Sequence, residues 1–199
     1  MITGLRPATF EKLQLNAGVL LVGFSPDSAK NAGELKTAVV AAIKAGTGLL
    51  GATRGGGTFS CTPEMRQVEA DGMRYSFKGS TINDRWVVKL SSTLIEITPE
   101  NFQRALGAAE MEKSGSVTTL RVRTDIKEED YIPKLCWVGD TSKGFVLIEL
   151  DNALNTTGAS FTFTDKGEGT LPFEFEAHQA DLENQEYAPC RIMFFDEAA

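Results

Sequence analysis

The sequence predicts a mainly β protein with one α-helix packed against a sheet and a second, short helix. Several segments alternate apolar and polar residues, which is the period of a β-strand with one buried face. Only two segments combine helical spacing with capping residues at both ends. The chain has 199 residues, of which 42% are hydrophobic, so it can bury one sizeable core and is expected to form a single domain over residues 1–199.

The N-terminal part of the chain predicts an arm, a strand and a helix. Residues 1–16 follow no clean period and are expected to form an N-terminal arm that lies against another surface. The apolar run AGVLLVGF, residues 17–24, has the length of a strand. A helix is predicted over residues 32–45, because Asn31 and Glu34 form a candidate capping box and a glycine follows the last turn.

A glycine-rich segment, GATRGGGTF at residues 51–59, allows two interpretations. Glycines in a phosphate-binding loop let backbone N–H groups approach the anion, but that motif continues with Lys and Ser or Thr at the start of a helix. No lysine follows here, and the next residues favour extended structure. We therefore predict a glycine-rich loop over residues 46–58, whose centre consists of Arg54, Gly55, Gly56 and Gly57.

The middle of the chain predicts mostly strands. The segment 84–97 alternates for much longer than the roughly 5–6 residues of a typical strand. It is therefore expected either to bend across two sheets or to belong to an assembly larger than one domain. Thr98 as N-cap, Pro99 at the first helical position and Gly107 as the stop predict a short helix. Further strands are predicted at residues 117–124, 134–140 and 144–151, with the charged segment 125–133 exposed between them.

The C-terminal third predicts a β-hairpin over residues 158–178. Phenylalanines alternate with polar residues on both sides of the turn DKGEG, so one face is aromatic and the other carries hydroxyls and carboxylates. The residues expected inside the subunit are Phe161, Phe163, Phe173 and Phe175. Glu174 and Glu176 are neighbours on one strand face without an aromatic platform, which favours a solvated acidic face over a glycosidase pair. One more strand and a short acidic tail are predicted at residues 189–199.

Composition argues against several classes of function. The net charge of -7, from 27 acidic and 20 basic residues, repels a phosphate backbone and disfavours a dedicated nucleic-acid binder. The single histidine, His178, makes a multi-histidine metal site impossible and has no nucleophile motif around it. The three cysteines have no CxxC spacing and are expected to be small buried side chains. We expect no catalytic residue, no cofactor and no metal.

The sequence also gives no sign of membrane insertion or export. No apolar run reaches the roughly 18 residues that a membrane span requires. Residues 1–16 lack the basic start and apolar core of a signal peptide. A cytosolic protein without membrane contact is therefore expected.

The order of these elements resembles the major tail proteins, or tail tube proteins, of long-tailed bacteriophages and related prophage elements. The resemblance covers about residues 15–195, and its most distinctive pieces are ATRGGGTF, LIEITPENF and GTLPFEFEAH. It implies a β-sandwich or barrel-like tail tube fold and a structural virion protein without enzymatic activity. Such proteins assemble into stacked rings, expected to be hexameric, that form the conduit for DNA ejection.

The resemblance also implies partners and a location. The expected partners are further copies of the chain, other tail proteins such as the tip, tape measure and terminator, and genomic DNA that passes through the lumen without specific binding. The protein would lie in the virion tail and be assembled in the host bacterial cytoplasm. The N-terminal arm and residues 46–58 are expected to contact neighbouring subunits. The candidate lumen face consists of Ser160, Thr162, Thr164, Glu174 and Glu176, and alternation alone leaves Lys89 or Glu149 as an alternative lumen set.

Two other functions stay open at this point. One is the inner tube of a contractile tail or a tailocin-like particle, which adds a sheath partner on the outer wall. The other is a small all-β ligand-binding module or enzyme that uses Glu174 and Glu176 or the acidic segment 128–130. The sequence contains neither a metal-ligand cluster nor a nucleophile with its base, which weighs against the second alternative.

Overall fold

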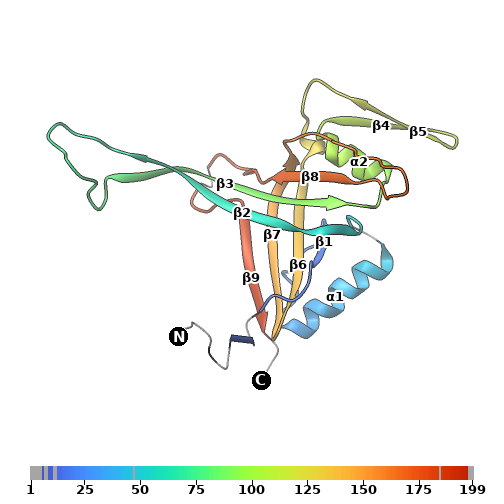
Figure 1. Cartoon of the computed structure of the whole chain (residues 1–199), viewed down its shortest axis with the longest axis horizontal. Helices are drawn as coiled ribbons and strands as arrows, with labels where there is room; N and C mark the ends of the chain where they lie inside the picture. Colours follow the sequence, from blue (N-terminus) through green and yellow to red (C-terminus); the bar gives the residue numbers. More distant parts are fainter. Residues whose placement is uncertain (1–5, 7–8, 11–12, 47, 184, 197–199) are drawn as a thin grey trace.

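The computed structural model describes residues 6, 9–10, 13–46, 48–183 and 185–196 (Figure 1). The described chain is mainly β with antiparallel sheets and two α-helices, which confirms the predicted fold class. Seven strands form one continuous path of hydrogen-bonded neighbours, which is divided into two sheets below. Their order is β1 (Val19–Val22), β6 (Ile132–Thr141), β7 (Gly144–Asn155), β8 (Leu171–Glu176), β3 (Thr81–Leu94) and β2 (Thr53–Gln67), and β9 (Cys190–Asp196) also pairs with β7.

Strand β7 belongs to two sheets. From Gly144 to Leu150 it pairs with β9 on one side and β6 on the other, whereas its last residues, Leu154 and Asn155, pair with β8. Between the two pairings lies Asn152, with a left-handed backbone (φ 44) that asparagine adopts more easily than most residues. Sheet A (β1, β6, β7 and β9) is therefore vertical in Figure 1, while sheet B (the end of β7, with β8, β3 and β2) runs across it horizontally.

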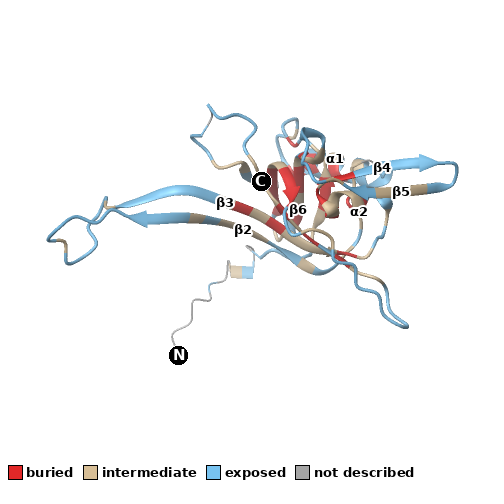
Figure 2. Ribbon diagram, turned by 90° about the horizontal axis from the view of Figure 1, so that it is seen from above, coloured by how far each residue is buried: buried red, intermediate tan, exposed pale blue. Residues whose placement is uncertain are grey.

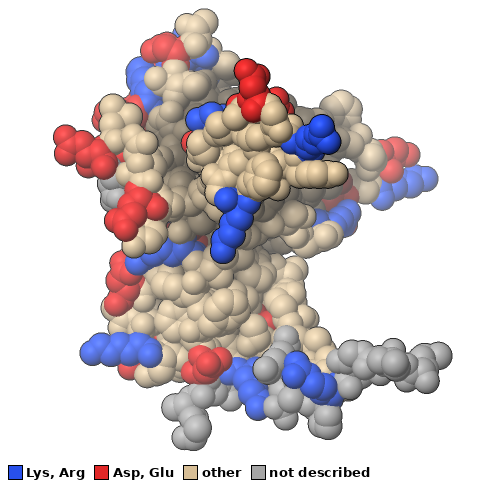
Figure 3. Space-filling view, turned by 90° about the vertical axis from the view of Figure 1, so that its left-hand side faces the viewer, with Lys and Arg blue, Asp and Glu red and all other residues tan. Residues whose placement is uncertain are grey.

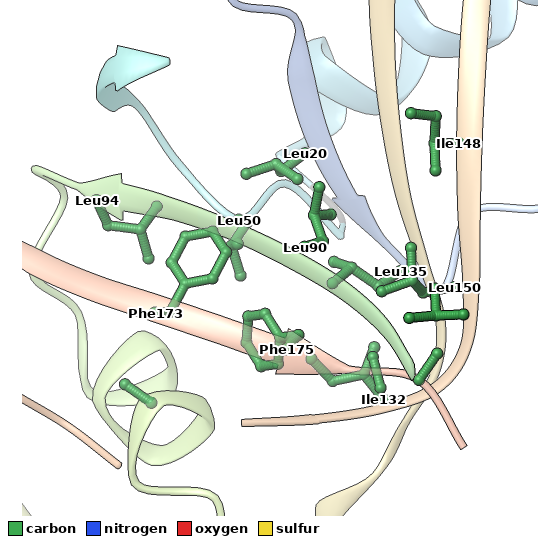
Figure 4. Packing of buried hydrophobic residues seen from close by; sticks show 14 of the residues in the cluster. Leu20, Leu50, Leu90, Leu94, Ile132, Leu135, Ile148, Leu150, Phe173 and Phe175 are labelled. Carbon is green, nitrogen blue, oxygen red and sulfur yellow. The ribbon is translucent and has the colours of Figure 1, made fainter. Parts of the chain in front are cut away.

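The main core lies between the two sheets (Figure 4). Leu135 and Leu150 of sheet A and Leu171 of sheet B are completely buried there. Phe173 and Phe175 of β8 point into the same cluster, with ring centroids 5.0 Å apart. Because successive side chains of a strand point to opposite faces, the intervening glutamates of β8 face outward, as the alternation predicts.

Helix α1 (Ala32–Ala45) covers the other face of sheet A. Leu35 and Val39 of the helix belong to a second buried cluster, together with residues of β1, β6 and β7. The helix ends at Gly46, which has the predicted left-handed conformation (φ 64). The body of the molecule thus consists of three layers, with α1 and sheet B on opposite sides of sheet A.

Both helices begin at the predicted caps. The Asn31 side chain accepts a hydrogen bond from the Glu34 N–H at 2.9 Å, and the Glu34 carboxylate accepts one from the Lys30 N–H at 2.8 Å, one residue before the usual capping-box partner. Helix α2 (Pro99–Leu106) follows Thr98, whose hydroxyl accepts from the Asn101 N–H. Local sequence therefore accounts for where both helices start.

A separate two-stranded sheet lies beside α2 and consists of β4 (Ala109–Ser114) and β5 (Val117–Val122) (Figure 1). The segment 125–133 follows it and contains a short 3₁₀ helix, η2 (Glu128–Asp130). The segment is exposed as predicted up to Glu129, but Ile132, where β6 begins, is buried. The side chain of Asp130 is also covered, and it accepts a hydrogen bond of 2.5 Å from Arg123. The ion pair explains why this carboxylate leaves the solvent.

The long strand β3 does not bend across two sheets. Its inner residues, 89–94, pair with both β2 and β8, whereas its outer residues pair with β2 alone. The strand that two sheets share is β7. Alternation is the same in a strand that crosses a sheet and in one that leaves the body, so the sequence did not separate these cases. The other expectation, an assembly larger than one domain, stays a prediction.

The hairpin predicted over residues 158–178 forms only in part. Thr162 and Thr170 make one isolated antiparallel bridge, and β8 pairs with β3 and the end of β7 instead of with residues 160–164. Phe161 and Phe163 are 39% and 79% exposed, so the prediction that they pack inside is wrong, whereas that for Phe173 and Phe175 is confirmed. Strand β3 pairs with the whole length of β8, and the end of β7 pairs with β8 at Phe175 and Glu176, while residues 156–170 form a loop, here called the 156–170 loop.

The final strand is confirmed as β9. Its residues alternate between the two faces of sheet A, with Met193 and Phe195 on the α1 side. The end of the acidic tail, residues 197–199, lies outside the described residues, as does most of the N-terminal arm before residue 13.

We expect Leu135→Ala to lower the free energy of unfolding by about 3 kcal/mol, because a completely buried leucine leaves a cavity between the sheets. Leu182→Ala is the matched control, since Leu182 is almost fully exposed and should change stability by less than about 0.5 kcal/mol. Urea unfolding followed by circular dichroism measures both. Equal losses for the two variants would contradict the assignment of the core.

Candidate functional site

The outward face of sheet B brings together several residues predicted for the lumen. Lys89 of β3 lies opposite Glu176 of β8, and Ser91 lies opposite Glu174. The Lys89 ammonium donates to Glu174 at 2.7 Å and lies 3.8 Å from a Glu176 oxygen. The hydrogen bond to Glu174 raises the pKa of Lys89. Lys89 and the two glutamates, predicted as alternatives, therefore occupy one face.

Hydroxyl groups occupy much of the remaining surface of that face. Residues that pair across neighbouring strands point to the same face of the sheet. The residues of β2 that pair with outward residues of β3 therefore also point outward, and they form a row of small polar side chains. The hydroxyl residues on this face are Thr58, Ser60 and Thr62 of β2 and Ser91 and Thr93 of β3. The face presents hydroxyls and carboxylates, and its single lysine is paired with both carboxylates.

The other candidate lumen residues are in the 156–170 loop. Ser160 borders an open groove of about 580 Å³ that Glu174 and the glycine segment also line. Thr162 and Thr164 are exposed farther along the loop and do not line this groove. The structure thus brings Ser160, Glu174 and the glycine segment together but leaves the two threonines apart from them.

The glycine segment is not a loop over its whole predicted length. Residues 53–58 belong to β2, where Thr53 pairs with Leu94 and Gly57 with Ser92, so the intervening residues form a bulge. Gly55 and Gly56 have positive φ angles of 81° and 77°. A Cβ on Gly57 would lie 2.6 Å from the Ser91 carbonyl oxygen. Glycine is therefore required for a bulged strand, and the predicted loop is corrected from Thr53 onward.

Arg54 connects this bulge to the 156–170 loop. Its guanidinium lies 2.7 Å from the Glu168 carboxylate, and the hydrogen bond lowers the pKa of Glu168. Both side chains are exposed, so the pair adds little stability by itself. Its effect is to hold the loop near the edge of sheet B. Contact of Arg54, Gly55, Gly56 and Gly57 with a neighbouring subunit stays a prediction.

Glu149, the other alternative for the lumen, is completely buried. Its carboxylate accepts hydrogen bonds from Lys134 at 2.7 Å and from Arg191 at 2.9 Å, and these cations also pair with Asp151 and Asp27. Burial lowers the pKa of Lys134, but hydrogen bonds to the two carboxylates outweigh this and raise it. Glu149 therefore holds neighbouring strands of sheet A together, and its proposed surface role is wrong for the folded chain.

Potential catalytic groups are occupied by structural contacts. The ring of His178 packs edge-on against Tyr131, and its Nδ1 lies 3.3 Å from the Asn152 carbonyl oxygen. Burial raises the pKa of Cys136 to about 12 and that of Cys190 to about 11, which keeps both as thiols. In the described part of the chain, no three His, Cys, Asp or Glu side chains are grouped to hold a metal ion.

The outer half of the β2 and β3 hairpin, residues 63–86, projects from the body as a two-stranded ribbon (Figure 2). We call it the projecting hairpin. One face continues the outward face of sheet B and carries two ion pairs, Arg85 with Glu64 at 2.7 Å and Arg66 with Asp84 at 2.8 Å. These pairs leave that face charged but locally balanced.

The opposite face of the projecting hairpin is apolar. It continues the core face of sheet B and carries Pro63, Met65 and Trp86, with no Lys, Arg, Asp or Glu among the paired residues of this face. Met65 is 59% exposed and Trp86 is 45% exposed. Beyond these residues, the tip exposes Tyr75 and Phe77. Large apolar side chains in solvent on a long ribbon are unusual for an isolated chain and mark a surface for interaction.

The described part of the N-terminal arm lies along the body. Leu15 donates its N–H to the Asp140 carbonyl, and the Leu13 carbonyl accepts from the Ser142 N–H. Residues 13–15 therefore extend the edge of sheet A next to the turn between β6 and β7. Contact of the arm with neighbouring subunits stays a prediction, and its first residues lie outside the described chain.

Neither the protein-family models nor the curated proteins compared with this sequence give a match. Within the described ranges, no helix is long and apolar enough to cross a membrane. The residues themselves must therefore support any functional conclusion.

Sequence reasoning missed the apolar face of the projecting hairpin. Alternation in TPEMRQ, residues 62–67, already placed Pro63 and Met65 on one face of the strand and Glu64 and Arg66 on the other. Pairing this segment with residues 81–87 would have shown an amphipathic ribbon, but the separation between the two segments concealed their partnership.

The thiol of Cys136 predicts a measurable dependence of stability on pH. Its pKa is about 12 in the folded chain, against about 8.5 in an unfolded chain. Because the folded pKa is the higher, the folded state favours the protonated thiol. The stability that the thiol contributes is complete below about pH 8.5 and is lost as the pH rises toward the folded pKa. Across that range it should lower the free energy of unfolding by about 1.4 kcal/mol per pH unit.

Cys136→Ala removes this contribution, while other titrating groups remain common to both proteins. Urea unfolding at several pH values between about 8 and 10 gives the free energy of unfolding at each pH. Plotted against pH, this free energy should fall less steeply for the variant. Parallel slopes would show that the thiol is not protected in the folded chain.

Proposed function

We propose that this protein is the subunit of a phage tail tube, a structural protein that assembles into stacked rings around a channel for DNA. The observation that carries the proposal is the projecting hairpin, with its ion pairs on one face and exposed Met65 and Trp86 on the other. Its chemistry matches an element made to be covered by another copy.

An uncovered ribbon of this kind needs a partner. Two-stranded hairpins without packing on a third element are marginal in water. The outer hairpin pairs only with itself, and its apolar side chains lie in solvent. Covering Met65 and Trp86 in an assembly removes apolar surface from water, which stabilises both the contact and the hairpin.

The outward face of sheet B has the chemistry that a DNA channel requires. Its hydroxyls and the Glu174 and Glu176 carboxylates offer DNA no unpaired cation, because Lys89 is bound by both glutamates. The net charge of the chain is -7, so phosphates are repelled overall. We assign this face to the lumen, through which genomic DNA passes without specific binding.

The proposal includes a role without catalysis or cofactor, in the tail of the virion, in contact with other tail proteins. It is supported by the structural contacts of His178 and by the raised pKa values of Cys136 and Cys190. The groove beside Ser160 is open and lined mostly by glycines and hydroxyl residues. Its charged residues, Arg54 and Glu174, pair with Glu168 and Lys89 and not with each other.

Electron microscopy of the purified full chain over a concentration series, with sedimentation alongside, tests the proposal. We expect rings or hollow tubes with an axial channel. Met65→Asp should raise the concentration needed for assembly by more than about tenfold, because it places a charge within the apolar contact. The variant should remain folded, since Met65 is exposed in the single chain.

Ile82→Asp provides a matched control on the same hairpin. Ile82 is also exposed but lies opposite Arg66 on the ion-pair face, so this variant should assemble like the unchanged protein. A protein that stays monomeric over the whole concentration range would overturn the proposed function. Equal effects of Met65→Asp and Ile82→Asp would show that the apolar face is not the contact.

A further inference from the structure

We infer that the apolar face of the projecting hairpin docks on the uncovered part of sheet A in a second copy of the chain, at Ile192 and Phe194 of β9. This inference rests on the proposed function and identifies the receiving surface for the hairpin. It describes a sandwich between sheets of two different subunits, built like the one within each subunit.

The hairpin side of the contact is an extension of the core. Within the body, the core face of sheet B packs Val88 and Leu90 against sheet A. The same face continues outward to Trp86, Met65 and Pro63, beyond the region that sheet A of the same subunit covers. The exposed apolar face is thus continuous with an interface that the fold already forms.

The β9 side is the complementary remainder of sheet A. Cys190, at the start of β9, packs against the core between the sheets. Ile192 and Phe194 point to the same side of the strand but are 50% and 74% exposed. Figure 1 shows why, since sheet B crosses the upper part of sheet A and the strands of sheet A continue below it.

A floor of apolar residues supports this bare surface. Ile192 pairs with Ile148 and Phe194 with Val146, and both partners on β7 are buried or nearly so. The intervening residues of β9, Met193 and Phe195, pack on the α1 side. An incoming side chain would therefore meet an ordered sheet surface and not a loose end.

The two surfaces also match in charge. No Lys, Arg, Asp or Glu lies among the named residues of either face, whereas the ion pairs of the hairpin occupy its other face. Figure 3, seen from the side of the hairpin tip, shows a broad area of side chains of other types on the body below the hairpin. Apolar surface against apolar surface leaves no buried charge unpaired.

The number of residues on each side indicates a weak single contact. A standard stable interface buries about 800 Å² per partner, which is more than three or four side chains supply. One hairpin on one β9 surface should therefore not give a tight dimer at low concentration. Repetition around a ring, where every subunit gives a hairpin and receives one, makes the assembly stable.

An experiment that introduces complementary charges on the two surfaces tests the contact directly. Met65→Lys and Phe194→Glu, each alone, should raise the concentration for assembly by more than about tenfold, because each places a single charge in an apolar contact. The double variant should assemble at a lower concentration than either single variant, since the lysine of one subunit then meets the glutamate of another. Both positions are exposed in the single chain, and circular dichroism should show unchanged folding.

Phe163→Glu is the matched control for Phe194→Glu, because it replaces another exposed phenylalanine on a different surface. It should assemble like the unchanged protein by itself, and it should not restore the assembly of Met65→Lys. Deletion of residues 1–12 tests whether the N-terminal arm occupies the β9 surface instead. Normal assembly of Phe194→Glu, or a double variant no better than both single variants, overturns the inference. If Met65→Asp still prevents tube formation, the proposed function stands with a different receiving surface.

A second measurement distinguishes direct contact from an indirect effect. Subunits with Met65→Cys are mixed with subunits with Phe194→Cys and oxidised with copper phenanthroline. Disulfide-linked dimers should form in the mixture and should be several-fold fewer in either protein oxidised separately. Equal amounts in all three samples would mean that the native cysteines, and not the proposed contact, form the link.

Discussion

The bend of β7 determines the rest of the architecture. Asn152 adopts a left-handed backbone between the segment that pairs with β9 and the residues that pair with β8. The buried Asn155 side chain then donates to the Ala105 and Gly158 carbonyls and accepts from the Glu174 N–H, which ties the bend to α2, the 156–170 loop and β8. Because one strand supplies both sheets, sheet B must cross sheet A, and two crossed sheets cannot cover each other along their whole lengths. The projecting hairpin is the part of sheet B that sheet A does not cover, and the exposed end of β9 is the part of sheet A that sheet B does not cover.

The other face of sheet A has no such uncovered part, and its chemistry explains why. Helix α1 covers the apolar positions, and the segment between β1 and α1 places Asp27 beside Arg191. Arg191 and Lys134 in turn neutralise the buried Glu149. A buried carboxylate without these partners would be strongly destabilising, so the network fixes which strands lie next to each other. Sheet A therefore has one face closed by the chain itself and one face that is only partly closed.

Local features of the structure could be predicted from the sequence, whereas pairing across distance could not. Asn31, Thr98 and Gly46 act within a few residues of their own positions, and both helices were located correctly. Phe173 and Phe175 were placed in the core because a strand alternates whatever its partners are. Phe161 and Phe163 alternate equally well but lie in a loop, since the strand partners of β8 are distant in sequence, namely β3 and the last residues of β7. The glycine segment was misjudged for a related reason, because composition reports backbone freedom and does not distinguish a bulged strand from a loop.

The same alternation gives one pair of strands two separate roles. On β3, Lys89 points outward to the glutamates of β8, while Val88 and Leu90 point into the core. Farther out, a bulge at Asp84 inserts one residue, so that Ile82 joins the ion-pair face and uncharged Asn83 lies beside Met65. In a regular ladder without the bulge, Asp84 would lie opposite Met65 and Ile82 opposite Gln67, so a carboxylate and an isoleucine would both lie on the apolar face. The bulge thus keeps the Asp84 carboxylate off the apolar face and leaves it paired with Arg66 on the other face. The apolar face stays narrow and uncharged, which favours a contact that needs many repeated partners over aggregation of isolated chains.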